Sequence, residues 1–127
     1  MIASDIMTRK VCTTRPETTV QELAQLLSRE HISGAPVVDE SGKIIGMVTE
    51  ADIISKVNRE NLQVADIMSR ELITVEEETQ VSEIASLLTE RKIKRVPVVQ
   101  NGKLTGIVSR ADIVHAVAQG HIVIRQW

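Results

Sequence analysis

Aromatic residues are almost absent from this sequence. Trp127 is the one aromatic side chain among its 127 residues, and neither Phe nor Tyr occurs. Aromatic rings form the stacking platforms that bind nucleic-acid bases and the cages that bind quaternary ammonium groups. The composition therefore excludes both kinds of site.

Cysteine, long apolar runs and an excess of one charge are missing as well. Cys12 is the only cysteine, which excludes an internal disulfide and a Cys-rich zinc site and suits a reducing compartment. No apolar run approaches the about 20 residues of a membrane-spanning helix, and Met1–Asp5 lacks the apolar stretch of a signal peptide. The 17 acidic and 15 basic residues give a net charge of −2, which does not favour nucleic-acid binding. We expect a cytoplasmic protein with no membrane association.

What the sequence does contain is a tandem repeat. Residues 5–39 align with residues 66–100, and residues 42–54 align with residues 102–114. The two copies are identical at 23 of these 48 positions, where average composition predicts about one identity in 15. The chain is therefore a duplication. We divide it into repeat 1 (residues 1–60) and repeat 2 (residues 61–127, with a short C-terminal tail).

Each copy carries the same series of predicted elements. Short β-branched runs at residues 11–13 and 72–75 predict a first strand. Apolar residues then recur at i, i+3, i+4 and i+7, which predicts an amphipathic helix. Two more apolar strands follow, joined by turns at residues 39–42 and 100–102, and a last helix is predicted at residues 50–58 and 110–118. The helical stripes are Val20, Leu23, Ala24 and Leu27 in repeat 1 and Val81, Ile84, Ala85 and Leu88 in repeat 2.

This order predicts a mixed α/β (α+β) fold of two β-α-β-β-α repeats. One copy of about 60 residues buries a small core and leaves an apolar sheet face uncovered, so it is marginally stable alone. We therefore expect the two copies to pack through their sheets around a pseudo-two-fold axis. The first segment of each copy, Asp5–Met7 and Asp66–Met68, is expected to pack against the other half.

Three motifs occur in both copies. Each copy begins with Asp-Ile-Met, continues with a Pro-Val-Val strand, a turn and Gly-Lys, and ends with Gly-hydrophobic-Val-[Thr/Ser]-x-x-Asp. In these motifs the sequence resembles a tandem pair of cystathionine-β-synthase (CBS) domains, often called a Bateman module. The resemblance covers about residues 1–118.

The resemblance implies a regulatory binding module with no catalytic residues, rather than an enzyme. Members of that family bind adenosine-containing ligands in clefts between the two repeats, and two modules commonly form a flat dimer. We expect AMP, ADP or ATP as the ligand, rank S-adenosylmethionine and NAD behind them, and expect no required cofactor. The expected partners are a second copy of the chain and a separate protein that the module regulates in trans.

The last motif supplies the sharpest candidates for ligand contact. Thr49 and Asp52 in repeat 1 correspond to Ser109 and Asp112 in repeat 2. A hydroxyl and free N–H groups at a helix start can meet a phosphate, and a carboxylate can accept hydrogen bonds from both ribose hydroxyls. The family's motif assigns these roles. The same spacing is also an ordinary helix-capping signature, so a purely structural role is the alternative.

The segment before each Pro is the second candidate, because in the family it lines the nucleotide cleft. Repeat 2 is cationic here, with Lys94 and Arg95 in the segment and Arg110 at the helix start, and such side chains favour phosphate oxygens. Repeat 1 offers Ser33 and Glu50 instead. We therefore expect repeat 2 to prefer a phosphorylated adenosine and repeat 1 to be weaker, differently selective or empty. Expected contacts to the base are Thr13, Ser33 and Ala35 in repeat 1 and Thr74, Val96 and Pro97 in repeat 2.

Other constellations give no site. His31, His115 and His121 lack ligand spacing, so no metal site is predicted, and neither a phosphate-binding loop nor a dinucleotide-binding fingerprint occurs. Two alternatives stay open: a ligand-free dimerisation or scaffolding module with the same fold, and nucleic-acid contact through Lys92, Lys94, Arg95 and Arg110. The tail, residues 120–127, is expected to pack on its own module or across a dimer interface.

Overall fold

The computed structural model describes residues 1–122, which form two compact units. The first-repeat unit is Cys12–Leu72. The second-repeat unit combines Met1–Val11 with the chain from Ile73 onward. Most of the tail for which a packing role was predicted lies outside the described residues. No helix within residues 1–122 has the length and apolarity needed to cross a membrane.

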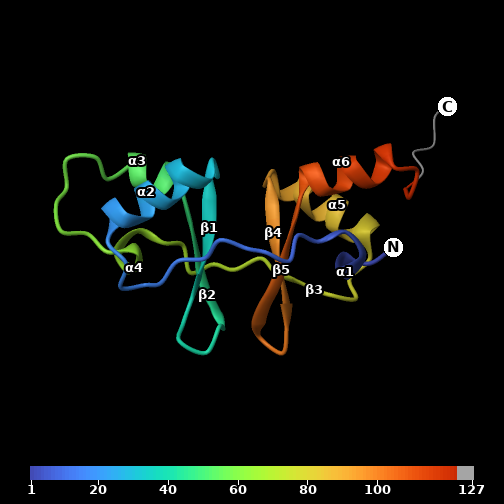
Figure 1. The fold of residues 1–127 in the computed structure, drawn as a ribbon, viewed down its shortest axis with the longest axis horizontal. Helices are drawn as coiled ribbons and strands as arrows, with labels where there is room; N and C mark the ends of the chain where they lie inside the picture. Colours follow the sequence, from blue (N-terminus) through green and yellow to red (C-terminus); the bar gives the residue numbers. More distant parts are fainter. Residues whose placement is uncertain (123–127) are drawn as a thin grey trace. The chain divides into compact units, whose positions relative to one another are not determined.

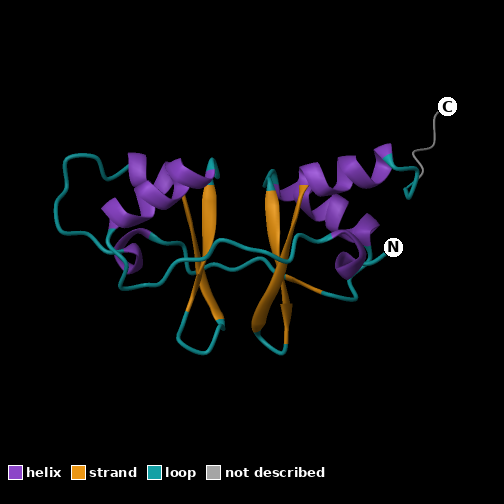
Figure 2. Ribbon diagram, viewed as in Figure 1, coloured by secondary structure: helices purple, strands orange, loops and turns teal. Residues whose placement is uncertain are grey.

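The first-repeat unit is built around an antiparallel hairpin. Helix α2 (Val20–Glu30) precedes strands β1 (Gly34–Val38) and β2 (Ile44–Thr49), which are followed by helices α3 (Glu50–Ile54) and α4 (Val64–Ile67). The register runs from Gly34 opposite Thr49 to Val38 opposite Ile44, with a bulge between Val37 and Val38. Figure 2 shows the strands of this hairpin with the unit's helices to one side of them.

The second-repeat unit has the same hairpin with one more short strand. Its elements are α1 (Ala3–Ile6), β3 (Val75–Glu76), α5 (Val81–Arg91), β4 (Arg95–Gln100), β5 (Lys103–Ser109) and α6 (Arg110–Ala118). The strands form one sheet in the order β3-β4-β5, in which β3 is parallel to β4 and β5 is antiparallel to it. The two units thus confirm the predicted mixed α/β class.

The Asp-Ile-Met segments exchange places between the repeats, as predicted. In the second-repeat unit, the Thr8 and Ile107 backbones hydrogen-bond to each other at 2.8 and 2.9 Å. In the first-repeat unit, Ser69 and Met47 make the same pair of bonds at 2.8 and 2.9 Å. Figure 1 shows dark blue α1 beside the orange and red elements of its unit, although these lie at the other end of the sequence.

A glycine under each exchanged methionine explains part of the repeated motif. A Cβ atom on Gly106 would lie 2.6 Å from the Met7 sulfur and 3.0 Å from the Thr8 carbonyl oxygen. A Cβ atom on Gly46 would lie 2.9 Å from the sulfur of Met68 and 2.9 Å from the Ser69 carbonyl oxygen. Only glycine leaves room for the exchanged segment to pair with the hairpin at these distances.

Each unit has its own apolar core, which includes residues of the exchanged segment. Apolar burial of this kind is the main stabilising contribution to folding. The core of the first-repeat unit is Leu23, Leu27, Ala35, Val37, Val48, Val64 and Ile67. The core of the second-repeat unit is Ala3, Met7, Val75, Ile84, Leu88, Val96, Val98 and Val108.

The first predicted strand is wrong at residues 11–13 and 72–74. Strand pairing begins only at Thr14, whose N–H donates to the Pro36 carbonyl oxygen and whose carbonyl oxygen accepts from the Val38 N–H, both at 3.0 Å. The next bond upstream would need an N–H group on Pro36, which proline lacks. In the second-repeat unit, β3 likewise begins at Val75, opposite the residue after Pro97. The proline therefore sets where the parallel pairing starts.

The last helices of the two repeats differ in length. Helix α6 spans Arg110–Ala118 as predicted, whereas α3 ends at Ile54 instead of continuing to Asn58. After Ile54 the chain continues in turns, in which the Lys56 N–H donates to the Ile53 carbonyl oxygen at 3.0 Å and the Val57 N–H to the Ile54 carbonyl oxygen at 3.3 Å. Asn58, the predicted last residue, has a φ of 76°, in the left-handed region that a helix does not include. Ile54 and its counterpart Val114 in α6 are 69% and 66% exposed, so burial does not explain the difference in length.

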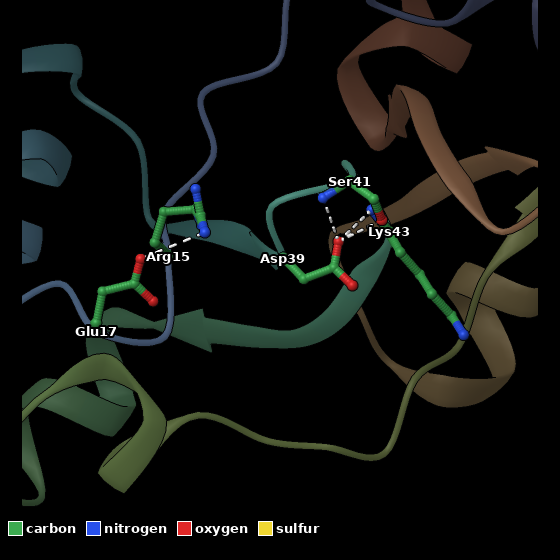
Figure 3. Close-up of polar contacts among 5 residues, drawn as sticks. All are labelled: Arg15, Glu17, Asp39, Ser41 and Lys43. Atoms are coloured by element: carbon green, nitrogen blue, oxygen red, sulfur yellow. Dashed lines mark hydrogen bonds and ion pairs between the residues drawn. The ribbon is translucent and has the colours of Figure 1, made fainter.

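The two hairpins close with different turns. In the first-repeat unit the Asp39 carboxylate accepts from the Ser41 N–H (2.9 Å), the Ser41 hydroxyl (2.7 Å) and the Lys43 N–H (3.0 Å), as Figure 3 shows. The hydrogen bond from the Ser41 hydroxyl is the main cause that lowers the pKa of Asp39 below its ordinary value of 3.8. In the other hairpin, Asn101 and Gly102 both have positive φ and form the two-residue turn typical of such hairpins.

Candidate functional site

The junction between β5 and α6 carries the candidate residues of the second-repeat unit. Ser109 ends the strand and caps the helix: its hydroxyl accepts from the Asp112 N–H at 3.2 Å. In return, the Ser109 N–H and hydroxyl donate to one carboxylate oxygen of Asp112, Oδ2, at 2.8 and 3.0 Å. Asp112 is half-buried at this junction.

The corresponding junction in the first-repeat unit lies between β2 and α3. The Thr49 N–H and hydroxyl donate to Oδ2 of Asp52 at 2.8 and 3.1 Å. Both motifs therefore make the bonds of a helix cap, which is the structural role that the spacing also predicts. Capping does not use up a carboxylate, because its two oxygens together offer about four acceptor positions.

Asp112 has a further hydrogen-bond partner that the sequence analysis missed. The Thr8 hydroxyl donates to its other oxygen, Oδ1, at 3.1 Å. Thr8 comes from the exchanged segment and directly follows Asp-Ile-Met. The residue in the same place of repeat 2 is Ser69, so a hydroxyl after this motif in both copies was the available signal.

The segment before Pro97 lies against the start of α6. The Arg110 N–H donates to the Lys94 carbonyl oxygen at 3.0 Å, and the Arg110 guanidinium Nε donates to the Ile93 carbonyl oxygen at 3.2 Å. The side chains of Lys94 and Arg110 are exposed, and Arg95 is half-buried. Lys94 and Arg110, two of the predicted cations, are thus neighbours through their backbones at the β5–α6 junction.

The equivalent position of the first-repeat unit has the opposite charge. The Glu50 N–H donates to the Ser33 carbonyl oxygen at 2.9 Å, which is the same backbone contact that Arg110 makes. Glu50 therefore stands where Arg110 stands, with an exposed carboxylate in place of a guanidinium. The exposed side chain at this position is therefore anionic in the first-repeat unit and cationic in the second-repeat unit.

The residues predicted to contact the base differ in exposure. Thr13 is exposed, and Ser33 and Thr74 are half-buried. The side chains of Ala35 and Val96 belong to the two cores, so only their backbone groups are available for a ligand. Pro97 is buried in β4.

The predicted residues fall into two separate sets, one in each unit. The described residues, 1–122, include no group of three or more His, Cys, Asp or Glu side chains that could hold a metal ion. The first-repeat unit holds Thr13, Ser33, Ala35, Thr49 and Asp52, and the second-repeat unit holds Thr74, Lys94, Arg95, Val96, Pro97, Ser109, Arg110 and Asp112.

Comparison with solved structures finds CBS domain pairs. CBSX2 in complex with AMP is similar over 95% of this chain and 98% of that chain, with a TM-score of 0.89 and 30% identity. The CBS domain pair of protein MJ0100, in complex with 5'-methylthioadenosine and S-adenosyl-L-methionine, is similar over 94% and 98% of the two chains, with a TM-score of 0.84 and 29% identity.

Sequence comparison leads to the same family. The uncharacterized protein MK0525 of Methanopyrus kandleri is 37% identical over 116 residues, which cover 87% of this chain and 59% of that protein. The chain thus spans little more than half the length of this relative. The CBS domain family model matches twice, at residues 3–59 and 64–119. With both matches on the repeated segments, the chain belongs to the CBS domain family as a tandem pair.

Proposed function

We propose that this chain is a regulatory module that binds an adenosine-containing ligand of the AMP, ADP or ATP class and is not an enzyme. One observation carries the proposal. The repeated [Thr/Ser]-x-x-Asp motif lies at a strand-to-helix junction in each unit, and in the second-repeat unit an exposed Lys and Arg lie beside it. The AMP complex of the related CBSX2 supports this ligand class.

In the second-repeat unit, each part of the ligand has a matching group. The Asp112 carboxylate, held by the N–H and hydroxyl of Ser109, accepts a ribose hydroxyl. The guanidinium of Arg110 donates to phosphate oxygens. Lys94 and Arg95 add positive charge. Thr74 and the backbone of Val96 and Pro97 are the proposed contacts to the base.

The first-repeat unit is proposed as the weaker site for phosphorylated ligands. Thr49 and Asp52 correspond to Ser109 and Asp112, and Thr13, Ser33 and Ala35 are its proposed contacts to the base. Glu50 takes the place of Arg110 and repels phosphate. S-Adenosylmethionine and NAD rank behind the AMP class for the chain as a whole.

The regulatory step is a population shift. A ligand that binds one arrangement of the module more tightly than another changes their ratio by no more than its difference in affinity. We propose that the module works as a homodimer in the cytoplasm and that a separate protein reads the altered arrangement. Tight binding also stabilises the fold, by about 2.7 kcal/mol when the free ligand is at 100 times its Kd.

Calorimetric titration of the nucleotide-stripped full chain with AMP, ADP, ATP, NAD and S-adenosylmethionine tests the proposal. Asp112→Asn should weaken binding of the preferred ligand by roughly tenfold or more, because the amide keeps one acceptor oxygen for the cap and loses the charge. Asp66→Asn is the matched control: Asp66 makes the same 2.8 Å bond, to the Gln63 N–H at the start of α4 in the first-repeat unit, and is not one of the proposed contact residues.

The alternative is a dimerisation or scaffolding module that binds no ligand. The capping bonds of Asp52 and Asp112 favour it, because they give both carboxylates a structural role without a ligand. No heat and no shift in melting temperature with any of the five compounds would contradict the proposed sensor and leave this alternative.

A further inference from the structure

The Asp112 carboxylate is held at both ends before any ligand binds. Ser109 donates twice to Oδ2, at 2.8 and 3.0 Å, and Thr8 donates to Oδ1 at 3.1 Å. A carboxylate hydrogen-bonded through one oxygen can still swing its other oxygen about the Cβ–Cγ bond, which is a broad torsion. With both oxygens bonded, that swing is restricted.

Thr8 is itself well placed to fix a partner. Its backbone makes two hydrogen bonds with Ile107, and Met7 beside it is buried against Gly106. Ile107 lies two residues before Ser109, so the strand that carries the cap also positions Thr8. The branched Cβ of threonine further restricts where its hydroxyl points.

The three donors leave Asp112 with one acceptor position. Of about four such positions on a carboxylate, two are on Oδ2 and are both used by Ser109, and one of the two on Oδ1 is used by Thr8. A ligand therefore meets one open position, on Oδ1, with a set direction. A carboxylate in this state accepts one ribose hydroxyl in preference to the other.

The first-repeat unit provides an internal comparison. Ser69 has the same two-way backbone pairing with Met47 that Thr8 has with Ile107. Within the described residues the hydrogen bonds to the Asp52 carboxylate come from Thr49, and both reach Oδ2. The serine lacks the branching methyl group of Thr8. The carboxylate of Asp52 is thus held at one oxygen, and that of Asp112 at two.

We propose that Thr8 is a positioning residue for ribose recognition in the second-repeat unit. It acts through Asp112: its hydroxyl fixes the direction of the one acceptor position on Oδ1 and so determines which ribose hydroxyl is accepted. This inference rests on the proposed binding of an adenosine ligand.

The test compares AMP, 2'-deoxyAMP and 3'-deoxyAMP by calorimetry. It uses the full chain carrying Asp52→Asn, so that the second-repeat unit dominates the signal. Thr8→Val should weaken AMP binding roughly threefold to tenfold, the range expected for one lost hydrogen bond. In this parent chain, which carries Asp52→Asn alone, the ratio of the affinities for 2'-deoxyAMP and 3'-deoxyAMP should lie well away from one. Adding Thr8→Val should move that ratio toward one. Thr8→Ser should keep most of both properties, and Ser69→Ala should change neither.

A shifted ratio is the decisive result, because a loss of stability alone would weaken both deoxy ligands equally. If AMP binds the parent chain and Thr8→Val leaves its affinity and the ratio unchanged, or binds AMP more tightly, the role of Thr8 is overturned while the proposed function stands. If the parent chain and the unmodified protein bind no AMP, the proposed function fails and the inference fails with it. Addition of Thr8→Val to Asp112→Asn should produce no further change, and a further loss would show that Thr8 does not act through Asp112.

Discussion

In the first-repeat unit, among the described residues, Asp52 is held by Thr49, whereas in the second-repeat unit Asp112 is held by Ser109 and also by Thr8. The same two junctions differ in charge, because Glu50 replaces Arg110. They differ in helix length too: α3 has five residues and α6 has nine. Duplication has kept the backbone of the junction and changed the side chains that a ligand would meet. Equal folds therefore do not imply equal sites.

The largest expected effect is on stability, and it comes from adding a methyl group to Gly106, which contacts Met7, or to Gly46, which contacts Met68. Gly106→Ala and Gly46→Ala should each lower the free energy of unfolding by about 1–3 kcal/mol through overpacking, measured by urea denaturation. At Gly106 the nearest atom is the flexible Met7 sulfur, at 2.6 Å, whereas at Gly46 a backbone oxygen is as near as the sulfur.

A double-mutant cycle in each unit tests which atom is the obstacle. Met7→Ala empties part of the core and is destabilising alone, but together with Gly106→Ala it should cost less than the sum of the two single effects, because the Met7 side chain is the nearest obstacle. Met68→Ala with Gly46→Ala should show a smaller coupling, because the Ser69 carbonyl oxygen remains in place. Equal coupling in both units would contradict the difference between them.

Exchanging the charges at the two junctions should exchange their preference for phosphate. Arg110→Glu should weaken AMP binding by roughly tenfold, in the range of a lost charged hydrogen bond, and Glu50→Arg should strengthen AMP binding in the first-repeat unit. Calorimetry with AMP and with adenosine measures both. Adenosine has no phosphate and should bind all variants alike, and an equal loss for adenosine would mean that Arg110 acts on the fold.

The smallest expected effect is a change in how the stability of the protein depends on acidic pH, and it comes from the difference between the two hairpin turns. The lowered pKa of Asp39 has its largest cause in the hydrogen bond from the Ser41 hydroxyl. The stability that the ionised Asp39 carboxylate contributes is therefore present above the ordinary pKa of 3.8. That stability is lost as the pH falls through the lower pKa of Asp39 in the folded protein. Gln100 occupies the same place in the other hairpin and does not titrate.

Thr19 similarly lowers the pKa of Glu22 below its ordinary value of 4.5 through hydrogen bonds from its hydroxyl and its N–H. Both carboxylates therefore lose stabilising hydrogen bonds in acid. Because Glu22 is still present, Asp39→Asn should reduce, but not abolish, the loss of stability between about pH 5 and pH 3. Thermal melts across this range measure it. Glu40→Gln removes the same charge next to Asp39 and should leave the slope as it is; an equal reduction would assign the effect to net charge.

The sequence predicted those elements that local patterns control. The helical stripes predicted α2 and α5, the turn residues predicted both hairpins, and α6 matched residue for residue. The first strands were wrong because a missing N–H on Pro36 and Pro97 depends on how the segments pair, which periodicity does not encode. Helix α3 was too long in the prediction: the helix ends at Ile54 and Asn58 has a left-handed φ, neither of which the apolar pattern shows.

For the candidate site, the motif residues were predictable and their partner was not. Thr49, Asp52, Ser109 and Asp112 repeat at fixed spacing, so their local bonds follow from the sequence. Thr8 reaches Asp112 across 104 positions, and only the exchange of the Asp-Ile-Met segments brings the two together. The charge difference between Glu50 and Arg110 could be read directly, because the repeat alignment places them in the same position.

The exchange of the first segment also has a consequence for the order in which the protein can fold. During synthesis Met1–Val11 emerges before its partners in β5 and α6, which come about a hundred residues later. At a synthesis rate of roughly 5–20 residues per second, Ile6 and Met7 are without their native neighbours for about 5–20 seconds. The first-repeat unit is contiguous in sequence and can close before that. The second-repeat unit is thus completed after the first-repeat unit, when Met1–Val11 meets β5 and α6.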